Sequence, residues 1–174
     1  MTTQAKAIID AKKASQKKAC QDAYELAERT AISKDQDWTF GATIYAFDDG
    51  SRVRFCGPDV ELYTLIDELA RKAASLASYD NTDTQALGNA VFEVVCDNTD
   101  RLAADGLLTA SDDWSNTGTP ANGSRAQALY PNFADTTALG EWEGFDLESV
   151  QKVCQGVMNV ARILCKEYEI RETK

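Results

Sequence analysis

The chain has 174 residues, of which 44% are hydrophobic and 26% charged, and its formal net charge is −10. These values are typical of a globular protein with a sizeable core, and they exclude a disordered chain. No apolar run reaches about 18 residues, so a membrane-spanning helix is not expected. The first residues lead into a charged helical pattern instead of the apolar core of a signal peptide, which predicts a cytoplasmic protein.

Five cysteines and the lack of histidine limit the chemistry that the chain can perform. No two cysteines have CxxC spacing, so we expect five thiols in a reducing compartment, with no bound metal or other cofactor. Without histidine, Ser–His and Cys–His nucleophile pairs are excluded. An enzyme would have to use carboxylates, Lys, Tyr, Cys or a metal, and we predict that the protein is not an enzyme.

Negative charge is concentrated in the middle of the sequence. Residues 31–149 include seven basic and twenty-one acidic residues, a net charge of −14, whereas residues 1–30 and 150–174 each have a net charge of +2. A surface of this kind repels nucleic acid and anionic lipid. Direct binding to nucleic acid or to a membrane is therefore not expected.

Hydrophobic periodicity predicts a single α+β domain over residues 1–174. A long first helix is expected to run to about Thr30, and its weakly apolar first half either protrudes or pairs with a partner helix. Two central helices are predicted, one that begins at Asp59 and one that opens at Thr82 and runs to Gly106, and a C-terminal helix begins at Asp146. Residues 109–144 are rich in polar residues and glycine but contain aromatic rings, which indicates a long ordered, irregular loop.

The most specific local signal is a β-hairpin over about residues 38–56. Apolar and polar residues alternate from Trp38 to Phe47, and Asp49-Gly50 follows as a two-residue turn, in which glycine accepts a positive φ. With these two residues as the loop, Phe47 lies opposite Arg52 and Tyr45 opposite Arg54. The free edges of such a hairpin also favour pairing with a second copy.

This register predicts that Tyr45, Phe47, Arg52 and Arg54 share one face of the hairpin. Two guanidiniums beside two rings would form a positive platform suited to a phosphate, a nucleotide base or an acidic loop of a partner. The alternative is a solvated outer face on which the arginines pair with neighbouring acids.

Three carboxylates, Glu93, Asp97 and Asp100, are spaced to share one face of the second central helix. Carboxylates arranged in this way hold Mg²⁺ in helical metal hydrolases, which makes a carboxylate–metal hydrolase the remaining enzyme hypothesis. However, no matching ExxE motif precedes them, and they lie opposite the apolar stripe of their helix. We therefore expect a solvated charged face.

The rings of residues 109–144 are the other candidates for a binding surface. Trp114, Tyr130 and Trp142 would line a pocket or an interface there. The alternative is that they attach a long loop to the core.

These features predict a small acidic protein that acts without catalysis, as an inhibitor or escort that presents a negative surface to a basic partner, such as a nucleic-acid-binding protein. A factor encoded by a phage or another mobile element would fit this description. Acidic residues also keep many proteins soluble without any partner. The alternative function is binding of a nucleotide or another phosphate-bearing small ligand at the aromatic and arginine face of the hairpin. A homo-oligomer through the hairpin edge or the terminal helices is a further expectation.

Overall fold

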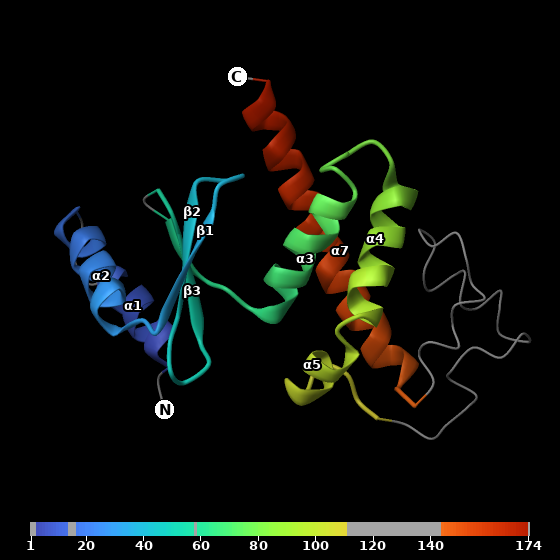
Figure 1. Ribbon diagram of the computed structural model, residues 1–174, viewed down its shortest axis with the longest axis horizontal. Helices are drawn as coiled ribbons and strands as arrows, with labels where there is room; N and C mark the ends of the chain where they lie inside the picture. Colours follow the sequence, from blue (N-terminus) through green and yellow to red (C-terminus); the bar gives the residue numbers. More distant parts are fainter. Residues whose placement is uncertain (1–2, 14–16, 58, 111–143, 174) are drawn as a thin grey trace, which may run out of the picture. The chain divides into compact units, whose positions relative to one another are not determined.

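The computed structural model describes residues 3–13, 17–57, 59–110 and 144–173. They form helices and a four-stranded antiparallel sheet, which confirms the predicted α+β class (Figure 1). None of the helices in these ranges is long and apolar enough to cross a membrane. The contacts divide the chain into two compact units, residues 1–64 and 65–174, so each is described by itself. A single domain over the whole chain stays a prediction.

The first unit begins with two helices, α1 (Gln4–Lys13) and α2 (Lys17–Thr30), which pack against each other. The prediction of one long helix is therefore wrong. Ala5 of α1 and Ala27 of α2 belong to the same apolar cluster on the sheet. In one straight helix these residues would lie roughly 33 Å apart, about twice the length of a five-residue strand. The chain has to fold back for both helices to reach the sheet.

Four strands follow in the order β1-β2-β3-β4, each antiparallel to the next. Their bounds are β1 Ser33–Asp37, β2 Ala42–Ala46, β3 Arg52–Cys56 and β4 Asp59–Leu62. The predicted hairpin is the central pair, β2 and β3. Its two outer edges are covered by β1 and β4 of the same chain, so these edges are not open to a second copy. The helix expected to begin at Asp59 is wrong at that point, because β4 occupies this segment.

The turn of the hairpin has three residues, Asp48 to Gly50, instead of the expected two. The amide of Phe47 donates to the carbonyl of Ser51 over 3.0 Å, and the amide of Gly50 donates to the carbonyl of Phe47 over 3.1 Å. Gly50 has φ +80°, the left-handed conformation that closes a type I turn with a bulge. Tyr45 consequently lies opposite Val53 instead of Arg54. This slip of one residue turns the side chains of β3 to the other face relative to β2.

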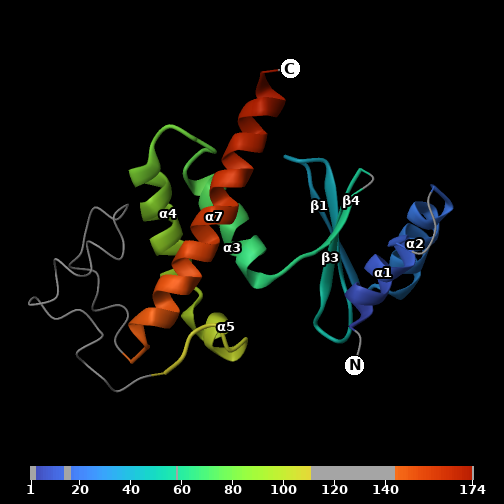
Figure 2. The ribbon, with the colours of Figure 1, turned by 180° about the vertical axis from the view of Figure 1, so that it is seen from behind.

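One face of the sheet packs on α1 and α2 and forms the core of the first unit (Figure 2). The buried members of this core are Ala5, Ile8, Ala23, Ala27, Tyr45, Phe47, Val53 and Phe55. Tyr24, Tyr45 and Phe55 form a group of edge-to-face rings, with centroids 5.4 to 6.2 Å apart. The hairpin thus contributes its aromatic side chains to the interior.

The second unit is built from helices α3 (Leu65–Leu76), α4 (Thr84–Cys96), α5 (Thr99–Ala104) and α7 (Leu147–Glu172). In Figure 1 the long helix α7 runs beside α3 and α4, and it packs on both. The side chains of Asp83 and Asp146 accept hydrogen bonds from the first amides of α4 and α7. The C-terminal helix is confirmed, and so are two central helices in the forms of α3 and α4. The predicted helix from Thr82 to Gly106, however, is interrupted at Asn98, where α5 begins a new segment.

Candidate functional site

The four hairpin residues predicted to form a binding platform lie on opposite faces of the sheet. Tyr45 and Phe47 are 0% and 2% exposed and pack on the helices of the first unit. Arg52 and Arg54 lie opposite Ala46 and Ile44 and are half-buried on the other face. The structure therefore does not bring the four side chains together, and the predicted geometry is wrong.

Each arginine instead contacts an aromatic ring that the sequence had not indicated. The guanidinium carbon of Arg52 lies 5.0 Å from the ring centroid of Tyr63, and that of Arg54 lies 6.0 Å from the ring centroid of Phe40. The amide of Tyr63 donates to the carbonyl of Arg52 over 3.0 Å, which continues the β3–β4 pairing by one residue. These rings were missed because Phe40 had been assigned to the hairpin strand and Tyr63 to a helix.

Acidic residues outnumber the arginines on this face of the sheet. Glu61 of β4 lies directly opposite Arg54, and Asp59 lies opposite Cys56. The register of β1 with β2 places Asp35 and Asp37 on the same face. Four carboxylates and two guanidiniums therefore share the face, and it has no excess of positive charge to attract a phosphate group.

On the helix-covered face, the hydroxyl of Tyr45 takes part in a polar cluster. It donates to Oε1 of Glu28 over 2.6 Å, and the Lys34 ammonium pairs with the same carboxylate oxygen. The contact with Lys34, and then the one with Tyr45, lowers the pKa of Glu28 to about 2, while burial raises the pKa of Tyr45 above its usual value. Near neutral pH the carboxylate is ionised and the phenol neutral. The cluster attaches β2 to α2 and offers no group that exchanges a proton in this range.

The net negative charge belongs almost entirely to the second unit. Residues 65–174 include nine basic and eighteen acidic residues, whereas residues 1–64 include nine basic and ten acidic residues. Between residues 80 and 105 every acidic side chain is exposed, and Arg101 is the only basic residue of that segment. These acidic residues are Asp80, Asp83, Glu93, Asp97, Asp100 and Asp105. We name this set the acidic segment.

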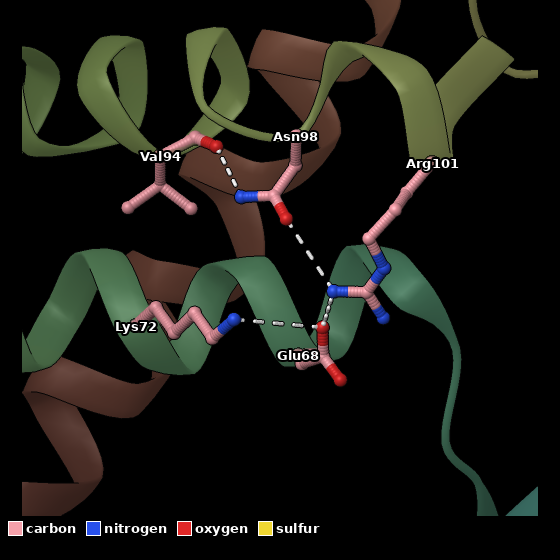
Figure 3. A network of polar contacts seen from close by, with 5 residues as sticks. All are labelled: Glu68, Lys72, Val94, Asn98 and Arg101. Atoms are coloured by element: carbon pink, nitrogen blue, oxygen red, sulfur yellow. Dashed lines mark hydrogen bonds and ion pairs between the residues drawn. The ribbon is translucent and has the colours of Figure 1, made fainter.

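Arg101 directs its charge toward α3, where it forms the network of Figure 3. Its Nη1 pairs with Oε2 of Glu68, and Lys72 lies 3.8 Å from the same oxygen. Asn98 accepts from Arg101 over 3.4 Å and donates to the carbonyl of Val94 over 2.7 Å. This network fastens the start of α5 to α3, so the only basic side chain of the acidic segment is engaged inside the unit.

The carboxylates predicted as a metal-binding alternative do not form a cluster. Glu93, Asp97 and Asp100 are exposed, and α4 ends at Cys96, so the helical spacing assumed for them is interrupted. In the part of the chain that the structure describes, no group of three or more Cys, Asp or Glu residues could hold a metal ion. A carboxylate–metal hydrolase is thus without a site in that part.

A hollow of about 440 Å³ lies in the second unit beside the first turns of α7. Its lining includes apolar Ile66 and Val153, and Gly156 contributes to it by lacking a side chain. The polar groups at its rim are already engaged: Ser149 bonds to the backbone of Thr109 and Asp146. Lys152 pairs with Glu148 over 3.6 Å. The lining therefore indicates no particular ligand.

The remaining predicted candidates, Trp114, Tyr130 and Trp142, lie outside the described residues. The backbone of Ala110 bridges to that of Phe145, so the two ends of the intervening segment meet. Comparisons with known protein families, with curated proteins and with solved structures give no match for this chain. Its function has to be argued from charge and geometry alone.

Proposed function

We propose that this protein acts without catalysis, as an inhibitor or escort, by presenting the acidic segment of its second unit to a basic partner protein. The observation that carries the proposal is the uneven charge: the second unit has a net charge of −9 and the first a net charge of −1. A surface that only served solubility would not require this separation, because either unit could carry the charge.

The acidic segment is suited to attract a partner from a distance. Six exposed carboxylates lie within 26 residues, and the one guanidinium among them contacts Glu68. A field of one sign accelerates encounter with an oppositely charged surface and weakens as salt is added, because the Debye length is about 8 Å at physiological ionic strength. The positively charged site of a nucleic-acid-binding protein is one such surface, since it already accepts a row of negative charges.

Charge reversal tests the proposal with a matched control. Replacement of Glu93, Asp97 and Asp100 by Lys removes half of the acidic residues of the segment. The control replaces Asp10, Asp22 and Asp48 of the first unit by Lys, which changes the net charge equally at exposed positions. We expect wild type and control to capture basic proteins from an extract of the native host at low salt, and the Glu93/Asp97/Asp100 variant to lose them.

The association rate of a purified captured partner then gives the decisive measurement. We expect this rate to fall steeply between low and physiological salt for wild type and to be low at both for the variant with the reversed segment. An association rate that does not respond to salt would contradict the proposal, as would equal capture by both variants.

A second candidate function is the binding of a phosphate-bearing small ligand at the arginine face of β3. The observation in its favour is that both guanidiniums stack on rings two residues apart along one strand; the four carboxylates of that face weigh against it. Nucleotides and inorganic phosphate should then raise the melting temperature of wild type, and Arg54→Ala should abolish the rise. A melting temperature unchanged by every such ligand would exclude this function.

A further inference from the structure

Strand β1 forms one edge of the sheet of the first unit, and large apolar side chains lie exposed at both of its ends. Ile32, just before the strand, is 68% exposed, and Trp38, just after it, is 86% exposed. An indole in contact with water forgoes a large apolar contribution, and tryptophan is among the residues that most often anchor protein interfaces. The two ends of β1 thus provide anchors for something that lies along the strand.

The edge strand between these anchors has the geometry for adding another strand. Among the described strands, β1 pairs with β2 alone. An edge strand directs alternate backbone amides and carbonyls outward, and an extended segment can pair with these groups. Ser33, Lys34 and Asp35 are exposed along the edge. The backbone there would supply affinity and the side chains at its ends selectivity.

A second copy of β1 is a poor occupant of this edge. A two-fold axis perpendicular to the sheet pairs the strand with its copy in registers centred on one residue. The three registers that pair at least three residues of β1 are centred on Lys34, Asp35 or Gln36. They place Lys34 opposite Lys34, Asp35 opposite Asp35, and Asp35 opposite Asp37, respectively. Like charges directly opposite each other destabilise a strand pair, so symmetric self-pairing is disfavoured.

We propose that β1 accepts an extended basic segment of the partner protein as a fifth strand, anchored by Ile32 and Trp38. This inference rests on the proposed function and names the part of the partner that the first unit would hold. Lys34 is paired with Glu28, so the charge that β1 adds to its edge is that of Asp35 and Asp37. A Lys or Arg opposite Asp35 completes a cross-strand pair of opposite charge, whereas an acidic residue there meets a like charge.

The test uses the full chain with Trp38 as its only tryptophan. Because the chain has three tryptophans, Trp114→Phe and Trp142→Phe leave Trp38 as the reporter. The probe is a short peptide of alternating Lys and Val. One control peptide has Glu in place of each Lys, and another has a central Pro, which removes a ladder amide and prevents strand pairing. We expect only the Lys–Val peptide to shift Trp38 emission to shorter wavelength and to protect it from acrylamide quenching.

Variants locate the response on the molecule. Asp35→Lys should weaken the apparent affinity for the Lys–Val peptide about tenfold, and the matched surface change Asp48→Lys should leave it unchanged. Circular dichroism of each variant confirms that the fold is kept. An equal response to the Pro-containing peptide would overturn the inference, because strand addition cannot then be its cause. A dimer seen by sedimentation and lost in Trp38→Ala would also overturn it, in favour of a second copy.

The acidic segment provides the comparison that separates this inference from the proposed function. The Glu93/Asp97/Asp100 variant should still bind the Lys–Val peptide at β1, because these residues belong to the second unit. If that variant loses the peptide while Asp35→Lys keeps it, the inference about β1 fails and the proposed function stands. If the peptide binds at β1 but partner capture does not respond to charge reversal, the proposed function fails on its own test.

Discussion

The two units of this chain use their acidic residues differently. In the first unit, individual carboxylates support the fold: Glu28 binds Tyr45 and Lys34, and Asp49 accepts from the amide of Gln4 at the start of α1 and from Ser51 in the hairpin turn. In the second unit, the acidic residues of α4 and α5 lie exposed on the outer surface of helices. The comparison indicates that charge serves structure in the first unit and is available for recognition in the second.

The largest expected effect separates the two faces of the hairpin. Tyr45→Ala removes a fully buried ring and its contacts with Tyr24 and Phe55, so we expect a loss of about 3–5 kcal/mol in the free energy of unfolding. Arg54→Ala, on the half-buried face, should cost below about 1.5 kcal/mol. Urea unfolding of both variants measures the difference. Similar losses for the two would contradict the observed register.

The same hairpin shows where sequence reasoning succeeds and where it stops. The helices of the second unit are predictable because the capping residues Asp83 and Asp146 and the apolar stripes are local signals. The hairpin is equally visible, but Asp49-Gly50 is compatible with a two-residue loop and with a three-residue loop, and one residue decides which face every side chain occupies. Since the predicted platform depended on that residue, the fold class was recovered while the geometry of the site was not.

The outer strands were missed for a different reason. The sequence of β1, Ser-Lys-Asp-Gln-Asp, has no apolar alternation, because this edge strand contributes no large apolar side chain to the core. Its position is fixed by pairing with β2, a tertiary interaction that no local pattern reports. The partners of the two arginines, Phe40 and Tyr63, follow from this same pairing and could not be found without it.

One substitution, glycine to alanine, should have opposite effects in the two units. Gly50 has φ +80°, and although its surroundings leave room for a Cβ, the left-handed backbone costs about 1–2 kcal/mol for alanine. Gly156 lies within α7, where a Cβ would meet Ile66 at an ordinary contact distance of 3.7 Å. Gly156→Ala should therefore stabilise the protein by about 0.5–1 kcal/mol. Thermal unfolding measures both, and destabilisation by Gly156→Ala would show that α7 has no space at this position.

A smaller effect is expected for the network that fastens α5 to α3. The Arg101 and Glu68 side chains are 49% and 20% exposed, so solvent screens their attraction. A double-mutant cycle with Arg101→Met and Glu68→Gln should give a coupling energy below about 1 kcal/mol. Chemical denaturation of the four proteins in the cycle measures it. A coupling well above this value would mean that the network carries much of the stability of the second unit.

The smallest effect concerns the carboxylate of Glu28 and its dependence on pH. Lys34 and Tyr45 lower the pKa of Glu28 from 4.5 to about 2 in the folded protein. A carboxyl group with a depressed pKa contributes stability that is present above pH 4.5 and is lost as the pH falls toward 2. The difference in melting temperature between wild type and Glu28→Gln should therefore be greatest above pH 4.5 and shrink toward pH 2. In a Lys34→Met background the main cause of the shift is absent, so this change with pH should be weaker. A difference in melting temperature that stays constant over this range would show that the ion pair between α2 and β1 does not support the first unit, and the contrast between structural and exposed carboxylates would lose its clearest example.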